Sequence, residues 1–355
     1  MLALQHILMN VYDCMVKEVT IYDIARELNC SIATVSRALQ NDPVVSAKTK
    51  KRILDLAEKK GYRSNYFASS LRKRKTHTIG VMMHELNSYF MVSVLSGIEK
   101  VLSETNYDII IAHSGESGKK EVANANNLFH KRVDGLIASL AYDTPNLAHF
   151  DQFTEKNIPI IFFDRVEENS TGTKVIINNQ KAGYEATQHL IDQGCKRIVH
   201  MTGFLTRNVY FYRMEGYKAA LKDNNMKFKE SYLFVNDLQK KACVETAKLI
   251  AKMKPLPDGI FITNDISAAI VMQTLKELGI KVPDDIAIVG FNNDIVSTIV
   301  EPKLTTIDYP GFNMGEVAAR NLINHLNGNG DIKLTSSIVI KSELLVRGSS
   351  LRINK

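Results

Sequence analysis

Residues 20–39 read TIYDIARELNCSIATVSRAL and contain two short amphipathic patterns, which meet at residues 29–31. In each pattern, apolar residues recur at the spacing of one helical face. Thr20 and Ser31 precede the two patterns, and both residue types are favoured at helix N-caps. Helices this short are unstable alone, so we expect them to share a core with a third helix, which the pattern predicts for residues 46–61.

The predicted second helix, residues 32–39, presents Ile32, Ala33 and Arg37 on its outward face. Two short helices joined by a tight turn are typical of a helix-turn-helix, whose second helix enters the major groove of DNA. A plain three-helix bundle would explain the apolar faces equally well. It would not explain the basic residues that surround them.

The positive charge of the chain is concentrated around this motif. Residues 19–76 hold thirteen Lys and Arg against five Asp and Glu, a net charge of +8, while the whole chain carries +7 and residues 1–18 carry −1. Residues 77–355 are therefore neutral overall. A small basic segment attached to a neutral body is the electrostatic pattern of a nucleic-acid-binding module.

Composition excludes several other classes of protein. The chain has 355 residues, 45% hydrophobic and 23% charged, which suits a globular protein of two or three units. No apolar run reaches the length of a membrane span, and the first residues lack the features of a signal peptide. The four cysteines form no C-x-x-C pair and the nine histidines show no metal-ligand spacing. We therefore expect a cytoplasmic protein without a membrane, metal or cofactor.

The segment 19–81 resembles, without a gap, the DNA-binding head and hinge of the lactose-repressor/galactose-repressor family of bacterial regulators. T-V-S-R at 34–37, after D-I-A at 23–25, is highly specific for that family. The resemblance implies that Ile32, Ala33 and Arg37 read base edges, that Thr34, Ser36, Ser46 and Asn65 contact the DNA backbone, and that Leu71 wedges into the minor groove. An apolar side chain just before the basic run at 72–76 suits such a wedge. Ser64 stands where the family usually has proline.

The rest of the chain alternates continuous apolar runs, such as 79–83 and 158–164, with amphipathic helical stretches, such as 265–278. This alternation predicts doubly wound parallel sheets, and its restart near residue 178 indicates two similar lobes. The resemblance implies a two-lobed, periplasmic-binding-protein-like α/β core in which the chain crosses between lobes three times. The final stretch, 336–349, alternates like an edge hairpin.

These patterns predict the domain boundaries. We expect an extension at 1–18, an all-α helix-turn-helix domain at 19–64, a hinge helix and basic linker at 65–76, and an effector-binding and dimerisation core at 77–355. Within the core, the first lobe should hold about 77–177 and 309–335. The second lobe should hold about 178–308 and 336–355. Translation could start at Met1 or at Met15, and residues 1–14 are assigned no function.

Ligands of parallel α/β sheets bind beyond the carboxyl ends of the strands, and two facing lobes form a cleft there. A carboxylate, amides and an arginine can bond sugar hydroxyls, and an aromatic ring can cover a sugar face. The candidates are Asn87, Tyr89, Phe90, Ser139, Asp164, Arg213, Asn264 and Asn292. The resemblance implies that Asp164, Arg213, Asn264 and Asn292 hold sugar effectors, with aspartate usual in place of Asn292. Asp164 could instead brace a loop and Phe90 could belong to the core. Arg207 and Asn208 resemble a pair that the purine-responsive branch uses near its ligand.

SGESGKK at 114–120 follows a strand and resembles a phosphate-binding loop, but His113 and Lys120 occupy the two end positions where such a loop needs Gly and Ser or Thr. No catalytic triad or paired-carboxylate cleft appears elsewhere, so we expect no enzyme. The sequence predicts a homodimeric repressor that binds a pseudo-palindromic, double-stranded operator and is controlled by a small effector, a sugar or sugar derivative. The alternatives are a solute-binding or sensory protein and a purine-responsive regulator.

Overall fold

The computed structural model describes residues 19–62 and 75–352 of the 355-residue chain. The chain divides into two compact units at Thr76, which we call the head (residues 19–62) and the core (residues 77–352). Several predictions lie outside the described residues: the extension at 1–18, the hinge helix and most of the basic run, with Asn65 and Leu71.

The head consists of α2 (Ile21–Glu27), α3 (Ile32–Leu39) and α4 (Ala47–Lys59). Their apolar faces meet in one small cluster built around Ile24, Val35 and Ile53. Gly61 follows α4 with a φ of +64°, a conformation that glycine adopts at little cost. The three predicted helices are therefore present, and each contributes its apolar stripe to the shared core.

The first lobe of the core is a six-stranded, all-parallel sheet within residues 77–352, in the order β11-β5-β4-β3-β1-β2. Its strands are β1 (Thr78–Met83), β2 (Asp108–His113), β3 (Gly135–Ala138), β4 (Ile160–Phe163), β5 (Thr173–Ile177) and β11 (Ser337–Ile340). One face packs on α6 (Tyr89–Ser103) and α14 (Gly311–Leu326), and the other on α7 (Gly118–His130) and α8 (Asp151–Glu155). A Cβ at Gly97 or Gly315 would collide with the backbone of the other helix of the α6–α14 pair, so these two positions require glycine.

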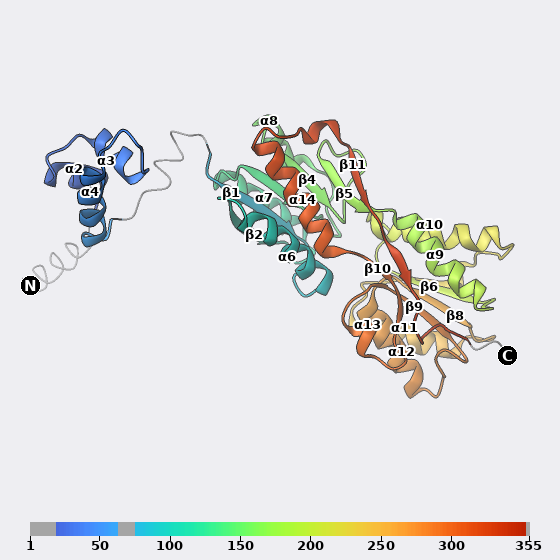
Figure 1. The fold of residues 1–355 in the computed structure, drawn as a ribbon. Helices are drawn as coiled ribbons and strands as arrows, with labels where there is room; N and C mark the ends of the chain where they lie inside the picture. Colours follow the sequence, from blue (N-terminus) through green and yellow to red (C-terminus); the bar gives the residue numbers. More distant parts are fainter. Residues whose placement is uncertain (1–18, 63–74, 353–355) are drawn as a thin grey trace, which may run out of the picture. The chain divides into compact units, whose positions relative to one another are not determined.

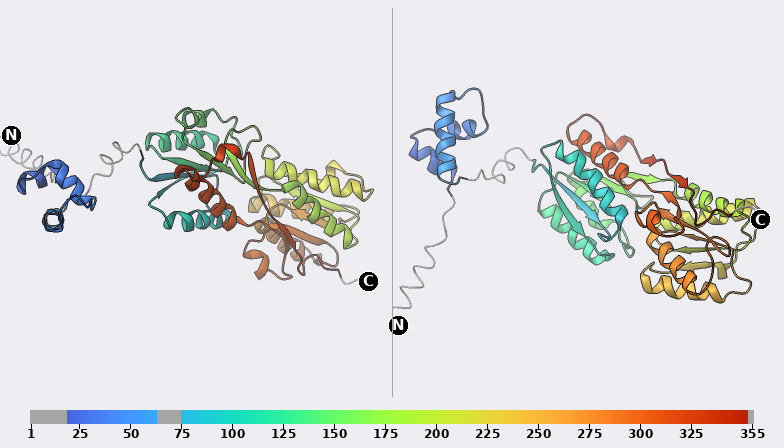
Figure 2. Two further views of the ribbon diagram at one scale, coloured as in Figure 1. Left: turned by 45° about the horizontal axis from the view of Figure 1, so that its top comes forward. Right: turned by 60° about the horizontal axis from the view of Figure 1, so that its bottom comes forward.

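The second lobe repeats this plan in the order β12-β10-β9-β8-β6-β7, with β12 antiparallel to β10 and the other pairs parallel. Its strands are β6 (Ile198–Thr202), β7 (Leu233–Val235), β8 (Gly259–Ile262), β9 (Ala287–Asn292), β10 (Thr305–Asp308) and β12 (Glu343–Leu345). The helices α9 (Asn179–Asp192) and α10 (Asn208–Asp223) cover one face, and α11 (Lys240–Lys252) and α12 (Asp265–Glu277) cover the other. A short helix, α13 (Val296–Ile299), follows β9. Figure 1 and Figure 2 show the two sheet-and-helix lobes and the strands that join them.

The chain passes between lobes three times within the core: after β5, after β10 and after β11. The predicted edge hairpin at 336–349 is wrong, because β11 pairs with β5 in the first lobe and β12 pairs with β10 in the second. The last crossing therefore follows Ile340, and residues 337–340 belong to the first lobe rather than to the second. The alternating pattern indicated two strands but carried no information about which sheet each would join.

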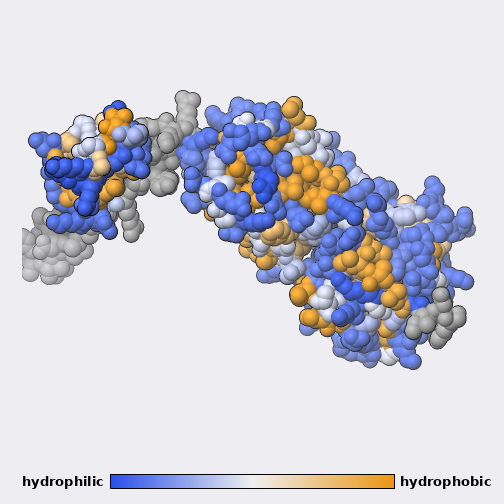
Figure 3. Space-filling view, in the orientation of Figure 1, coloured by the Kyte–Doolittle hydropathy of each residue, from blue (hydrophilic) through white to orange (hydrophobic). Residues whose placement is uncertain are grey.

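Apolar side chains also reach the surface of both lobes (Figure 3). On the second lobe these include Ile266, Ile295 and Ile299, the last of which is 74% exposed. On the first lobe they include Tyr89 and Val92 of α6. None of the helices that the structure describes is long and apolar enough to cross a membrane.

Candidate DNA interface and effector site

The α3 helix of the head carries the candidate base-reading residues. Its first turn is fixed by Ser31, whose Oγ accepts a hydrogen bond from the Thr34 amide at 3.1 Å. Ile32, Ala33 and Arg37 are all exposed on the face opposite the core. The structure therefore brings these three side chains together on one exposed helical face, the arrangement that major-groove recognition requires.

The candidate backbone contacts lie around the two N-caps of the head. The Thr34 hydroxyl lies 2.8 Å from the Ser31 hydroxyl, and the Ser46 hydroxyl lies 2.9 Å from the Thr49 hydroxyl while it also caps α4. Ser36 is half-buried on α3. Helix N-termini with free N–H groups suit phosphate oxygens, so the position of Ser46 agrees with its predicted contact.

Sequence reasoning gave no role to Tyr22, an aromatic side chain of α2 that is 60% exposed and, like Arg26 and Glu27, lies outside the buried stripe of this helix. It also missed Lys50, whose ammonium group donates to both the main-chain and side-chain oxygens of Asn41 and so holds the turn after α3. The signal for Tyr22 was that an aromatic residue lies outside the apolar stripe of Ile21, Ile24, Ala25 and Leu28.

Asp164 follows β4 with a φ of +57° and is almost fully buried at the junction of the lobes. Its carboxylate accepts a hydrogen bond of 2.6 Å from the hydroxyl of Tyr309, which lies on the second crossing between lobes. Burial raises the pKa of Asp164, while the Arg165 guanidinium, the Tyr309 hydrogen bond and Arg213 act to lower it. The structure therefore gives Asp164 a bracing contact at the junction of the two lobes.

Arg213 reaches the same junction from α10 in the second lobe. Its Nε donates to Asn179 Oδ1 at 2.9 Å and its Nη1 donates to the Thr263 carbonyl at 3.1 Å. The centre of its guanidinium lies 3.6 Å from the Phe291 ring and 5.3 Å from the Tyr309 ring. Burial lowers its pKa. The side chain is thus held rigidly, with a flat cation facing aromatic rings.

Asn292 ends β9 and Asn264 lies two residues after the neighbouring β8, and each forms a hydrogen bond within its own loop. Asn264 caps α12 by accepting from the Ser267 amide at 3.0 Å. Asn292 has a φ of +116°, and its Nδ2 donates to Asp294 Oδ2 at 3.4 Å. Both side chains are partly exposed at the carboxyl ends of their strands.

Two buried carboxylates lie behind Asn292. Burial raises the pKa of Asp265 to about 7 and that of Asp294 to about 6. Asp265 accepts from the Thr306 hydroxyl at 2.7 Å and from the Asp294 amide at 2.8 Å. An aspartate at position 292 would place a third carboxylate 3.4 Å from Asp294. Like-charge repulsion therefore gives a physical reason for the neutral amide at this position.

The other candidates divide between surface and core. Ser139 is buried, with its hydroxyl 2.9 Å from His84 Nδ1. Asn87 and Tyr89 are exposed at the start of α6. The Phe90 ring lies in the hydrophobic core, stacked on Tyr309 with ring centroids 4.2 Å apart. The structure thus supports the alternative that Phe90 is a core residue, and it acts on the site by fixing the Tyr309 ring.

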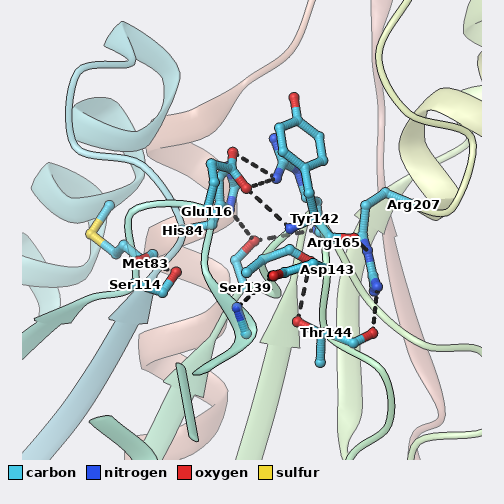
Figure 4. A network of polar contacts seen from close by, with 12 residues as sticks. Met83, His84, Ser114, Glu116, Ser139, Tyr142, Asp143, Thr144, Arg165 and Arg207 are labelled. Carbon is cyan, nitrogen blue, oxygen red and sulfur yellow. Dashed lines mark hydrogen bonds and ion pairs between the residues drawn. The ribbon is translucent and has the colours of Figure 1, made fainter. Parts of the chain in front are cut away.

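A polar network that joins the two lobes was not predicted. We call it the interlobe network; it comprises Glu116, Tyr142 and Arg165 of the first lobe and Arg207, Asn208 and Tyr210 of the second. Arg165 lies at its centre, with Nη1 2.7 Å from Glu116 Oε2, Nη2 donating to the Tyr210 hydroxyl at 3.2 Å, and the guanidinium centre 4.1 Å from the Tyr142 ring. Figure 4 shows Glu116, Arg165 and Tyr142 converging beside the strand ends of the first lobe.

The Arg207 side chain forms the second half of the network and is almost fully buried. Its Nη2 donates to the Thr144 carbonyl at 2.8 Å (Figure 4). Its Nε donates to the Tyr142 carbonyl at 3.2 Å, and its Nη1 pairs with Glu167 at 3.0 Å. The neighbouring Asn208 exchanges hydrogen bonds with the first lobe, accepting from the Val166 amide. The start of α10 is therefore bonded to the loops that follow β3 and β4.

The loop after β3, whose carbonyl groups accept hydrogen bonds from Arg207, is itself held by a residue of α7. Glu121 of α7, fully buried, accepts from the Ala141 amide at 2.7 Å and from the Thr144 hydroxyl at 2.9 Å. Because Glu121 holds both ends of this short loop, the two carbonyls that Arg207 contacts are held in place. The available sequence signals were the arginine directly after Asp164 and the Arg207-Asn208 pair. No group of three or more His, Cys, Asp or Glu suited to a metal ion is present in residues 19–62 and 75–352.

Comparison with known proteins matches both units of the chain. Residues 20–65 match the bacterial regulatory proteins of the lacI family, and residues 187–350 match the periplasmic binding protein-like domain. Catabolite control protein A of Priestia megaterium is 33% identical over 310 residues, which cover 87% of this chain and 93% of that protein.

Two solved structures share the fold over nearly the full length. The transcriptional regulator CelR in complex with cellobiose superposes with a TM-score of 0.70 at 26% identity, covering 94% of this chain and 100% of that one. The lac repressor dimer bound to operator and an anti-inducer superposes with a TM-score of 0.83 at 22% identity, covering 95% and 100%. At 22% identity, the similarity to the lac repressor structure shows a shared fold.

Proposed function

The chain belongs to the lacI family of bacterial regulatory proteins, and on that premise we propose that a sugar or sugar derivative bound between its lobes controls its affinity for operator DNA. The protein is a DNA-binding transcriptional repressor under effector control and not an enzyme, as the sequence predicted. It acts as a homodimer on double-stranded operator DNA. This identity excludes the solute-binding alternative. We place its action in the cytoplasm, where a bacterial operator lies.

The observation that carries the effector proposal is the meeting of Asp164 and Arg213 at the lobe junction. Each is buried, each comes from a different lobe, and both contact Tyr309. A carboxylate accepts hydrogen bonds from sugar hydroxyls, and a guanidinium donates to two adjacent oxygens at once. The CelR structure, which binds cellobiose, supports this ligand class by similarity.

We propose the remaining effector contacts from the positions of the residues in the two lobes. Asn264 and Asn292 would bond further hydroxyls from the second lobe, and Asn87, Tyr89 and Ser139 would do so from the first. The polar groups of Arg207 and Asn208 form hydrogen bonds with the first lobe, and one of these joins Asn208 to the Asp164 carbonyl. That use argues against the purine-responsive alternative, since the pair is not free for a purine.

For the DNA side we propose that Ile32, Ala33 and Arg37 read bases in the major groove. Thr34, Ser36, Ser46 and Asn65 would contact the backbone, and Leu71 would wedge into the minor groove. The support for the first three is their shared exposed face on α3.

The experiment measures operator affinity by fluorescence anisotropy with a labelled pseudo-palindromic operator, with and without a panel of sugars, sugar derivatives and purines. We expect one sugar-class ligand to shift the affinity of the wild type by 5- to 150-fold, the usual range of such coupling. Arg213→Ala should bind operator normally and ignore that ligand. Arg197→Ala is the matched control, since this arginine precedes β6 at the opposite end of the sheet and pairs with Asp258. A response of Arg213→Ala equal to that of the wild type would overturn the role of Arg213, and a purine response would overturn the ligand class.

A further inference from the structure

A cavity of about 310 Å³ lies at the lobe junction and has walls from both lobes. β5 contributes Lys174 and Ile176 and the start of β11 contributes Ser337, while α9 and α10 contribute Asn179 and Tyr212. β5 and β11 run side by side in the first lobe and approach the start of α10 (Figure 1). Its volume is at the lower end of ligand pockets, so it suits a small molecule. None of the roles assigned above explains this cavity.

The wall of this cavity includes a buried cation without a counter-charge. Lys174 is 9% exposed, and its Nζ donates to two main-chain carbonyls, those of Glu168 at 2.8 Å and Ser170 at 3.4 Å. Among the residues that the structure describes, no carboxylate forms an ion pair with it. Burial of an ammonium without an opposite charge is unfavourable, so an anionic group in the cavity would be stabilised here.

Neutral polar groups surround the lysine. Asn179 borders the cavity and uses its Oδ1 for Arg213, while its amide nitrogen is a further hydrogen-bond donor. The hydroxyls of Tyr212 and Ser337 can both donate and accept. The side chain of Glu168 also borders the cavity, but this residue is exposed, and water screens its repulsion of an anion. Such a lining suits a molecule with one negative group and several hydroxyls.

Two residues that line the cavity form hydrogen bonds with Arg213 and Asp164, the residues to which we assign effector binding. Asn179 accepts from Arg213 at 2.9 Å, and Asn208 donates to the Asp164 carbonyl at 3.1 Å while it also borders the cavity. Since the walls belong to different lobes, a rotation of one lobe against the other changes the shape of the cavity. A ligand held there must therefore favour one lobe arrangement over another.

We propose that this hinge cavity is a second ligand site, which binds a small polyhydroxylated organic anion with its negative group on Lys174 and its hydroxyls on Asn179, Tyr212 and Ser337. Sugar phosphates and sugar acids share this chemistry. Occupancy of the site changes the response to the effector in the cleft. This effect on the effector response rests on the proposed function, whereas binding of the anion in the hinge cavity does not.

The test is isothermal titration of the full chain at constant ionic strength with ribose 5-phosphate against ribose, gluconate against glucose, and inorganic phosphate. We expect at least one of the two anions, ribose 5-phosphate or gluconate, to bind at least tenfold more tightly than its neutral parent sugar. Preference for ribose 5-phosphate over ribose would indicate a phosphate ligand, and preference for gluconate over glucose would indicate a carboxylate ligand. Lys174→Met should weaken that binding at least tenfold, while Arg197→Ala, which removes a cation at the opposite end of the second-lobe sheet, should leave it within about twofold. Inorganic phosphate should bind more weakly than the phosphorylated sugar.

A second variant keeps the test decisive if Lys174→Met fails to fold by its thermal transition. Ser337→Trp adds bulk at the exposed start of β11, fills the cavity and leaves Lys174 intact, and it should also abolish binding. The proposal is overturned if no anion binds the wild type, if the folded Lys174 or Ser337 variant binds as tightly as the wild type, or if Arg197→Ala weakens binding as much as Lys174→Met. If the anion binds through Lys174 but no sugar shifts operator affinity, this inference stands and the proposed effector control fails.

Discussion

The hydroxyl of Tyr309 donates a hydrogen bond of 2.6 Å to the carboxylate of Asp164, which lies 145 residues earlier in the chain. Tyr309 lies on the crossing from β10 to α14, and Asp164 lies at the end of β4. This bond therefore fixes a connection between lobes to the strand end where we place the effector. The Phe90 ring, stacked on Tyr309, holds the donor in position.

We expect Tyr309→Phe to lower the free energy of unfolding of the core by roughly 1–3 kcal/mol, because a buried carboxylate loses its donor while the ring stack remains. Urea denaturation followed by circular dichroism measures the change. Tyr184→Phe, which removes a hydroxyl from a half-exposed tyrosine of α9, is the control and should change stability by less than about 0.5 kcal/mol. Equal effects of the two variants would show that the Tyr309 bond contributes nothing specific.

The buried Asp294 makes a pH-dependent contribution to stability. Its folded pKa is about 6, raised mainly by burial, against an ordinary value of about 3.9. The folded state therefore holds this proton more tightly than the unfolded state, so its stability falls as pH rises from about 4 to 6 and then stays level. We expect Asp294→Asn to be more stable than the wild type by roughly 1–3 kcal/mol at pH 8, with the difference vanishing near pH 4.

Urea titrations of both proteins at pH 4, 5, 6 and 8 test this expectation. Asp284→Asn, at an exposed position before β9, removes the same charge without burial and should show no such trend. A difference between Asp294→Asn and the wild type that does not vary with pH would mean that the carboxyl group titrates normally in the folded protein.

Much of the fold was predictable because its signals are local. The strand IIFF of β4 is buried on both faces and reads as a continuous apolar run, and the caps Ser31 and Ser46 mark the starts of their helices. β7 has no comparable signal, because it is only three residues long and is partly exposed at the edge of the sheet. The partner of β11 was missed because pairing over more than 150 residues leaves no mark in the strand itself.

The site was predictable to the extent that it lies at strand ends. Asp164 follows β4 directly, Asn264 lies two residues after β8, and Asn292 is the last residue of β9. The topology of a parallel sheet brings such residues to one edge. What each side chain bonds was not predictable, because Tyr309 reaches Asp164 from a distant crossing. The contacts of Arg207 with two main-chain carbonyls depend on lobe geometry, which no local pattern encodes.

On the DNA side, we expect Arg37→Ala to weaken operator binding by roughly 1–3 kcal/mol and to relax preference at one base position, the usual effect of losing a bidentate base contact. Anisotropy with a set of single-substitution operators measures both quantities. Arg26→Ala removes the same charge from α2 and should weaken binding to all operators alike. An Arg37 variant that keeps the base preferences of the wild type would exclude this residue from base reading.

Arg207 links the start of α10 to the first lobe through three hydrogen bonds, two of them to main-chain carbonyls. We expect Arg207→Met to weaken effector binding by about 5- to 150-fold, since the observed arrangement of the lobes loses contacts that the effector must then supply. The variant leaves the head intact, so a change of operator affinity without effector would report the shift between lobe arrangements. Titration calorimetry with the effector and anisotropy with the operator separate the two quantities.

Glu167→Gln is the matched control for Arg207→Met. It removes the charge that faces Arg207 but leaves both carbonyl contacts, and the Glu167 side chain is 45% exposed, so its ion pair contributes little. We therefore expect effector affinity within about threefold of the wild type, on the scale of an exposed ion pair. If Arg207→Met binds effector as tightly as the wild type while Arg213→Ala does not bind it, the interlobe network serves packing alone. If both Arg207→Met and Glu167→Gln weaken binding equally, the charge pair rather than the carbonyl contacts holds the lobes together.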